Sequence, residues 1–170
     1  GNIQKLSSVE HDYLKDGYWA MNRSEELPCE GLTVTFLQYM KDITPMLEKA
    51  EKKALKAGTD IEEAVEATIT RLADEAKRDN PYCEVEIESF YNENVYYLIV
   101  YKVYKDVRFV GAPPSSIGKF GADTDNWMWP RHTGDFSMFR VYADRNGNPA
   151  EYSPANVPLK AKNHLQISLE

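Results

Sequence analysis

A twelve-residue stretch, DNWMWPRHTGDF from Asp125 to Phe136, brings together residue types that can do chemistry. It holds two tryptophans, two aspartates, an arginine and a histidine, and its apolar residues follow neither a helical nor a strand period. The stretch ends a segment of about 25 residues, starting at Gly111, whose composition is typical of one long loop between strands. Loops of this length inside compact domains are usually functional, so we expect a site here.

Asp135 is the main candidate for catalysis in this loop, because it follows Thr133 and Gly134 and directly precedes a predicted strand. A carboxylate at a strand end can hold a histidine in one tautomer, and that histidine can then activate a nucleophile. The alternative is a turn aspartate that accepts hydrogen bonds from its own backbone. His132 lies only three residues away in a turn, a spacing at which a histidine rarely serves as the partner base.

The other chemistry that the loop offers is ligand binding. Trp127 could form the wall of a pocket, and the amide of Asn126 could donate or accept hydrogen bonds there. The alternative is that Trp127 and Trp129 bury their rings only to anchor the loop on the sheet.

Residues that bind metals are scattered along the chain. His11, His132 and His164 lie far apart, and no combination of Cys and His has the spacing of a zinc site. We therefore expect no metal and no cofactor. Cys29 and Cys83 fit a single disulfide, two buried thiols, or bonds to cysteines elsewhere, and the sequence leaves these alternatives open.

The composition excludes two classes of partner. The net charge of −7 argues against a general nucleic-acid binder, which needs clustered Lys and Arg. No apolar run approaches the roughly 20 residues that a membrane-spanning helix needs. The 170 residues suffice for one domain with a real core.

Two helices are predicted in the middle of the chain. Thr44-Pro45 is a typical helix start, and Gly58 can end that helix just after Ala57. A capping-box pattern, Thr59-Asp60-Ile61-Glu62, opens a second helix that Asn80-Pro81 ends. We interpret residues 44–79 as a helical hairpin inserted into a β domain and packed on its sheet.

The rest of the chain has the period of two that is typical of strands. Cys83, Val85 and Ile87 should share one face, with three glutamates on the other, a pattern that favours a solvated face over a cation site. Strands are predicted at 32–36, 82–88, 95–104, 107–110, 136–142 and 156–169, with a tight turn at 144–147. The pattern predicts a mainly β, antiparallel fold, either a barrel or a sandwich, with the helical hairpin as an insertion.

Two long strings resemble one family. These are GKFGADTDNWMWPRHTGDFSMFRVYAD, from Gly118 to Asp144, and the opening GNIQKLSSVEHDYLKDGYWAMNRSEELPCEGLTVTFL. Both are similar to the bacterial exo-dipeptidyl-peptidases of the dipeptidyl peptidase 7 and 11 type. Ala122 departs from the family's pattern, in which a glycine is expected.

The resemblance implies a chymotrypsin-like, trypsin-like serine protease fold, in which residues 1–170 form the first β-barrel of a larger peptidase. It implies a periplasmic enzyme that releases dipeptides from peptides with a free N-terminus and works as a homodimer. Asp135 matches the aspartate of the His-Asp-Ser triad. Asn126 and Trp127 match residues that hold the terminal amine of the substrate.

The resemblance also implies that most of the active site lies outside this chain. The catalytic histidine would precede Gly1, together with the signal peptide, and the serine would follow Glu170. The chain alone should therefore be inactive. Two other readings stay open, a non-catalytic β domain that binds peptides or carbohydrate and a purely structural β domain.

Overall fold

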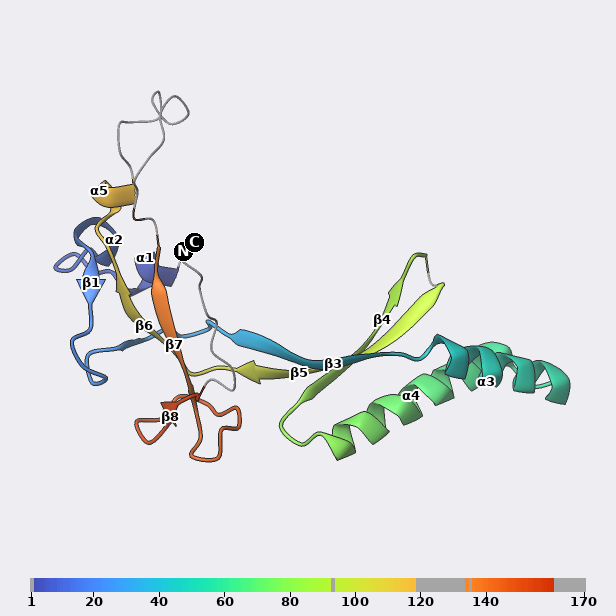
Figure 1. The fold of residues 1–170 in the computed structure, drawn as a ribbon. Coiled ribbons are helices and arrows are strands. Elements are labelled where there is room, and N and C mark those ends of the chain that lie inside the picture. The colour runs from blue at the N-terminus through green and yellow to red at the C-terminus, as the bar shows by residue number, and fades with distance from the viewer. Residues whose placement is uncertain (1, 93, 119–133, 135, 161–170) are drawn as a thin grey trace, which may run out of the picture. The chain divides into compact units, whose positions relative to one another are not determined.

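The computed structural model describes residues 2–92, 94–118, 134 and 136–160 (Figure 1). The chain divides into two compact units. Unit 1 consists of residues 1–34 and 104–170, and unit 2 consists of residues 35–103. Within the described part of the chain, no helix is long and apolar enough to cross a membrane.

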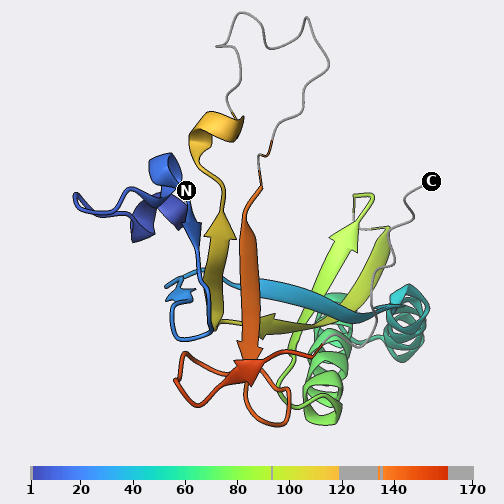
Figure 2. The same cartoon turned by 60° about the vertical axis from the view of Figure 1, so that its left-hand side comes forward.

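Unit 1 is built on an antiparallel sheet in the order β1-β6-β7-β8, with β2 also paired to β6. The strands are β1 (Tyr18–Trp19), β2 (Leu27–Pro28), β6 (Val107–Ala112), β7 (Met138–Ala143) and β8 (Val157–Pro158). Three short helices accompany them, α1 (Asn2–Leu6), α2 (Tyr13–Asp16) and α5 (Ser115–Gly118). Figure 2 shows β6 and β7 running side by side as the long central pair.

The core of unit 1 forms around Phe109 on β6, which is fully buried. The ring of Tyr18 stacks on it at a centroid distance of 5.6 Å, and the ring of Phe139 lies 5.5 Å away. Cys29 and Ala112 are buried in the same cluster. This core therefore ties β1 and the loop after β2 to the central strands.

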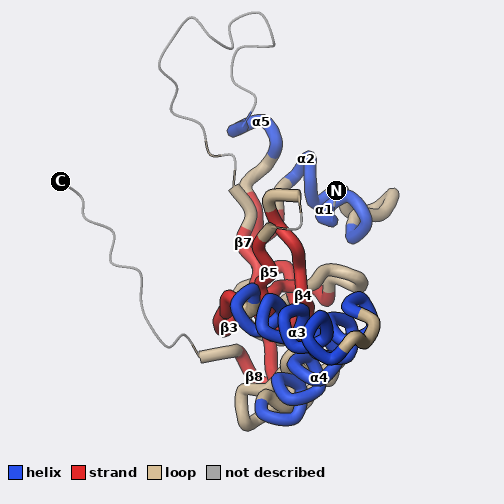
Figure 3. Tube along the Cα trace, turned by 90° about the vertical axis from the view of Figure 1, so that its right-hand side faces the viewer, coloured by secondary structure: helices blue, strands red, loops and turns tan. Residues whose placement is uncertain are grey.

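Unit 2 is a three-stranded antiparallel sheet with a helix pair. The strands β3 (Val34–Asp42), β5 (Val95–Tyr104) and β4 (Glu84–Phe90) lie in the order β3-β5-β4. The helices are α3 (Thr44–Ala57) and α4 (Ile61–Asp79), which pack against each other (Figure 3). The predicted helical hairpin at 44–79 is confirmed.

The two faces of the β4-β5 hairpin differ as the sequence predicts. Cys83, Val85 and Ile87 pack against a buried cluster shared by the helices and the sheet. That cluster consists of Ile43, Leu47, Leu72, Ala76, Leu98 and Val100. Glu84, Glu86 and Glu88 are exposed on the opposite face.

The N-terminal cap of each long helix differs from the prediction. The N-cap of α3 is Ile43 rather than Thr44, and the Thr44 hydroxyl instead accepts a hydrogen bond from the Tyr96 N–H at 2.9 Å. The N-cap of α4 is Asp60, whose carboxylate accepts from the Glu63 N–H at 3.0 Å. Gly58 ends α3 with a left-handed φ of 69°, as predicted.

The predicted fold class holds at a coarse level. The chain is a mixed α/β structure in which a half-barrel sheet accompanies a helix pair, rather than a mainly β domain. The strand predicted at 32–36 instead spans Val34–Asp42, and only Val157–Pro158 of the segment predicted at 156–169 forms a described strand. Cys29 and Cys83 are free thiols and do not form a disulfide with each other.

Candidate functional site

The residues predicted to do chemistry lie outside the described residues. This applies to Asp135, Asn126 and Trp127, and also to Trp129 and His132. The structure does describe the chain on both sides of them, up to Ile117 in α5 and again at Gly134 and Phe136. The residues on either side of the loop can therefore be described.

The strands that flank the loop in the sequence, β6 and β7, are neighbours in the sheet. The strands β6 and β7 pair antiparallel, with Val107 opposite Val141 and Gly111 opposite Met138. A register shift between Phe109 and Gly111 marks a bulge near the end of β6. The last residues of β6 thus lie beside the first residues of β7 (Figure 2).

Strand β1 closes this end of the sheet on the other side of β6. Trp19 lies opposite Gly111, and a Cβ built on Gly111 would lie only 2.5 Å from Cε3 of the indole. The ring of Trp19 therefore sits directly against the glycine, where no other residue type leaves room for it. The Ala20 N–H donates to the Val110 carbonyl at 2.8 Å, which continues the pairing past the strand.

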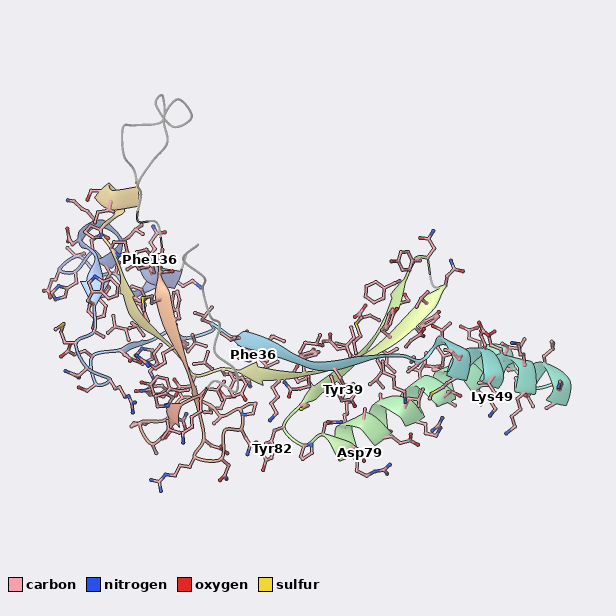
Figure 4. All side chains as sticks on the ribbon, in the orientation of Figure 1. Phe36, Tyr39, Lys49, Asp79, Tyr82 and Phe136 are labelled. Carbon is pink, nitrogen blue, oxygen red and sulfur yellow. The ribbon has the colours of Figure 1, made fainter. Side chains whose placement is uncertain are left out.

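Trp19 also reaches the start of β7. Its ring lies 6.2 Å from the ring of Phe136, measured between centroids and with the planes tilted by 56°. Each of the two side chains keeps 50% of its surface exposed. Figure 4 shows Phe136 at the entrance of β7, beside the end of β6.

Gly134, the residue before Asp135, is also closely packed. A Cβ built on Gly134 would lie 3.0 Å from Cγ2 of Ile117 and 3.9 Å from Cγ of Pro113. The chain next to Pro114 is tight as well, because a Cβ on Gly17 would meet the proline Cδ at 2.8 Å. Gly17 has φ of 76°, so both its conformation and its space require glycine.

A groove of about 380 Å³ lies beside α2 in unit 1. It is lined by His11, Asp12, Tyr13, Asp16, Gly17 and Tyr18. The ring of His11 stacks on Tyr13 at 6.0 Å, and Asp12 accepts from the N–H groups of Leu14 and Lys15. These contacts cap α2 and give the groove a structural role.

Unit 1 also contains a buried network of charges that the sequence reasoning missed. Asp106 accepts two hydrogen bonds from the Arg108 guanidinium, at 2.9 and 2.8 Å, and a third from Asn156 at 2.9 Å. The guanidinium also donates to the Ser153 carbonyl at 3.0 Å and lies 3.7 Å from the centre of the Tyr142 ring.

A second ion pair extends this network on β7. Glu26 is buried and accepts from Nε of Arg140 at 2.8 Å and from the Tyr142 hydroxyl at 2.7 Å. Within the described residues, every buried side-chain nitrogen or oxygen has a hydrogen-bond partner. Both pairs therefore join loops distant in sequence to the two central strands.

Burial and hydrogen bonding compete at these groups. Burial acts to raise the pKa of Asp106, but the hydrogen bonds from Arg108 and Asn156 outweigh it and hold that pKa below the usual 3.8. The same pairing raises the pKa of Arg108. Burial, followed by the hydrogen bond to Glu26, raises the pKa of Tyr142.

A period of two was the signal available for this network. Asp106 and Arg108 alternate with Val107 and Phe109, so they share a face if the segment is a strand. Arg140 and Tyr142 are likewise two residues apart on β7. In the sheet, Arg108 lies directly opposite Arg140. None of the residues of this network lies in the loop with the predicted site, so we assign the network to stability.

Comparison with known proteins places the chain in a family. The family model described as Peptidase S46 matches residues 1–170. The chain belongs to the peptidase S46 family.

S46 relatives match along nearly the whole chain, with about half of the aligned residues identical. An Asp/Glu-specific dipeptidyl-peptidase of Porphyromonas gingivalis is 51% identical over 172 residues, covering 98% of this chain and 24% of the relative. Dipeptidyl-peptidase 7 of Phocaeicola vulgatus is 53% identical over 176 residues, covering 100% of this chain and 24% of the relative. The chain thus spans about a quarter of the length of these S46 relatives.

A solved S46 structure has the same fold over this segment. Porphyromonas endodontalis DPP11 in complex with the dipeptide Arg-Glu matches with a TM-score of 0.74 and 46% identity. The match covers 97% of this chain and 24% of the other. The half-barrel sheet and the helix pair therefore correspond to a segment of an S46 dipeptidyl-peptidase.

Proposed function

We propose that this chain is the first barrel of a serine-type exo-dipeptidyl-peptidase that releases dipeptides from peptides with a free N-terminus. The observation that carries the proposal is the identity of about half of all residues with named dipeptidyl-peptidases along the whole chain. The family match over residues 1–170 supports the same conclusion. The whole enzyme would be periplasmic and homodimeric, as the resemblance of the sequence implies.

Within that enzyme, Asp135 is the orienting carboxylate of the triad. It would accept a hydrogen bond from a histidine that precedes Gly1 and would stabilise the imidazolium that forms when the serine loses its proton. The described residues beside Asp135 in the sequence support this role. Asp135 directly precedes Phe136 at the entrance of β7, where the close packing around Gly111 and Gly134 leaves little freedom for the chain.

Asn126 and Trp127 bind the amino end of the peptide substrate. The amide oxygen of Asn126 would accept a hydrogen bond from the protonated terminal amine of the peptide, and the indole would form the wall beside it. A peptide without a charged free amine would lose these contacts. Such a clamp fixes the distance from the amino end to the bond that is cut, so the product is a dipeptide.

The preference for the residue next to the cleaved bond is set outside this chain. The chain is 51% identical to an Asp/Glu-specific enzyme and 53% identical to a dipeptidyl-peptidase 7, so residues 1–170 resemble both types equally well. We place the determinants of that preference, together with the nucleophilic serine, in the segment that follows Glu170.

Replacement of the proposed triad carboxylate tests this function. In the full-length enzyme, Asp135→Asn should lower kcat for dipeptidyl fluorogenic substrates by roughly 10³- to 10⁴-fold, because the amide favours the wrong histidine tautomer. The control is Asp74→Asn, at an exposed carboxylate on α4, which should leave kcat unchanged.

A second measurement tests the amine clamp. The same substrates with an acetylated amino end should not be cleaved by the unaltered enzyme. Full activity of Asp135→Asn would contradict the triad role of Asp135. Cleavage of the acetylated substrate would contradict the assignment of the enzyme as an exopeptidase.

A further inference from the structure

We draw no further inference here: the strongest candidate, the exposed apolar side chains along edge strand β3 of unit 2, carries none, because nothing in the described part of the structure shows what covers them in a chain that spans about a quarter of the length of its relatives.

Discussion

Asp106 and Arg108 show how single residues decide the stability of unit 1. The Arg108 side chain is 9% exposed and that of Asp106 is 1% exposed, so both charges are almost entirely removed from water. Such a pair is tolerated because each charge is matched by hydrogen bonds on several sides. Here Asn156 and the Ser153 carbonyl complete the set, and the ring of Tyr142 covers the guanidinium.

Removal of one partner should leave the other charge uncompensated. We expect Asp106→Asn to lower the free energy of unfolding of residues 1–170 by about 3 kcal/mol at pH 7. The measurement is urea unfolding followed by tryptophan fluorescence, since all three tryptophans belong to unit 1. Asp74→Asn, at an exposed position on α4, should leave the midpoint unchanged.

This difference should depend on pH in a defined direction. The pKa of Asp106 in the folded chain lies below its ordinary value of 3.8, so its contribution is complete above about pH 3.8. It is lost as the pH falls through the lowered pKa, whereas asparagine does not titrate. The unfolding curves of the unaltered chain and Asp106→Asn should therefore converge below pH 3.8, and a constant gap would contradict the assignment.

At the scale of elements, local alternation of apolar and polar residues predicts which face of a strand is buried. The alternation of Cys83, Val85 and Ile87 with three glutamates predicts the faces of β4, because one face packs on α4 and the other meets solvent. The alternation at residues 32–36 predicts a strand, but it does not continue along β3. Nearly all of its residues are exposed, so neither face is selected for apolar residues and its bounds were misjudged.

The start of α4 shows where a local rule becomes ambiguous. Thr59 and Asp60 are each followed three residues later by a glutamate, so both fit a capping box. The structure selects Asp60, whose carboxylate accepts from the Glu63 N–H, while the Thr59 hydroxyl turns back to the Ala54 carbonyl at 3.4 Å. Tertiary packing of the preceding turn makes the choice, and the sequence pattern alone does not contain it.

The two candidate caps predict different mutational effects. Asp60→Ala should lower the free energy of unfolding of unit 2 by about 1 kcal/mol, because the first turn of α4 loses its side-chain acceptor. Thr59→Ala should have a smaller effect, since its hydroxyl bond is long and lies outside the helix. Thermal unfolding followed by circular dichroism at 222 nm reports on the helices, and the reverse order of the two variants would refute the assigned cap.

For the buried network of unit 1, local rules fail for another reason. Recognition that Glu26 pairs with Arg140 requires the register of β7 against the segment before β2, which are separated by more than 100 residues. The alternating pattern around Arg108 identifies a shared face, but not the partners that make a buried arginine acceptable. The frame around Gly111 is equally hidden, because the sequence does not say which ring lies against that glycine.

At the scale of the whole molecule, the proposed function depends on segments that are far apart along the polypeptide. The chain spans about a quarter of the length of its dipeptidyl-peptidase relatives. In the proposed scheme it contributes one triad member, Asp135, and part of the amine clamp. In that scheme the histidine would precede Gly1 and the serine would follow Glu170, so residues 1–170 would supply neither the base nor the nucleophile.

The chain of residues 1–170 should therefore hydrolyse no dipeptidyl substrate by itself. An orienting carboxylate without its histidine and serine has no proton acceptor to orient and no nucleophile to activate, and loss of either partner removes nearly all triad catalysis. The measurement compares this chain with the full-length enzyme at equal molar concentration, using a fluorogenic substrate with a free amino end. Hydrolysis that co-purifies with residues 1–170 and disappears in Asp135→Asn would show that the chain carries its own nucleophile, and the proposed division of the active site would be wrong.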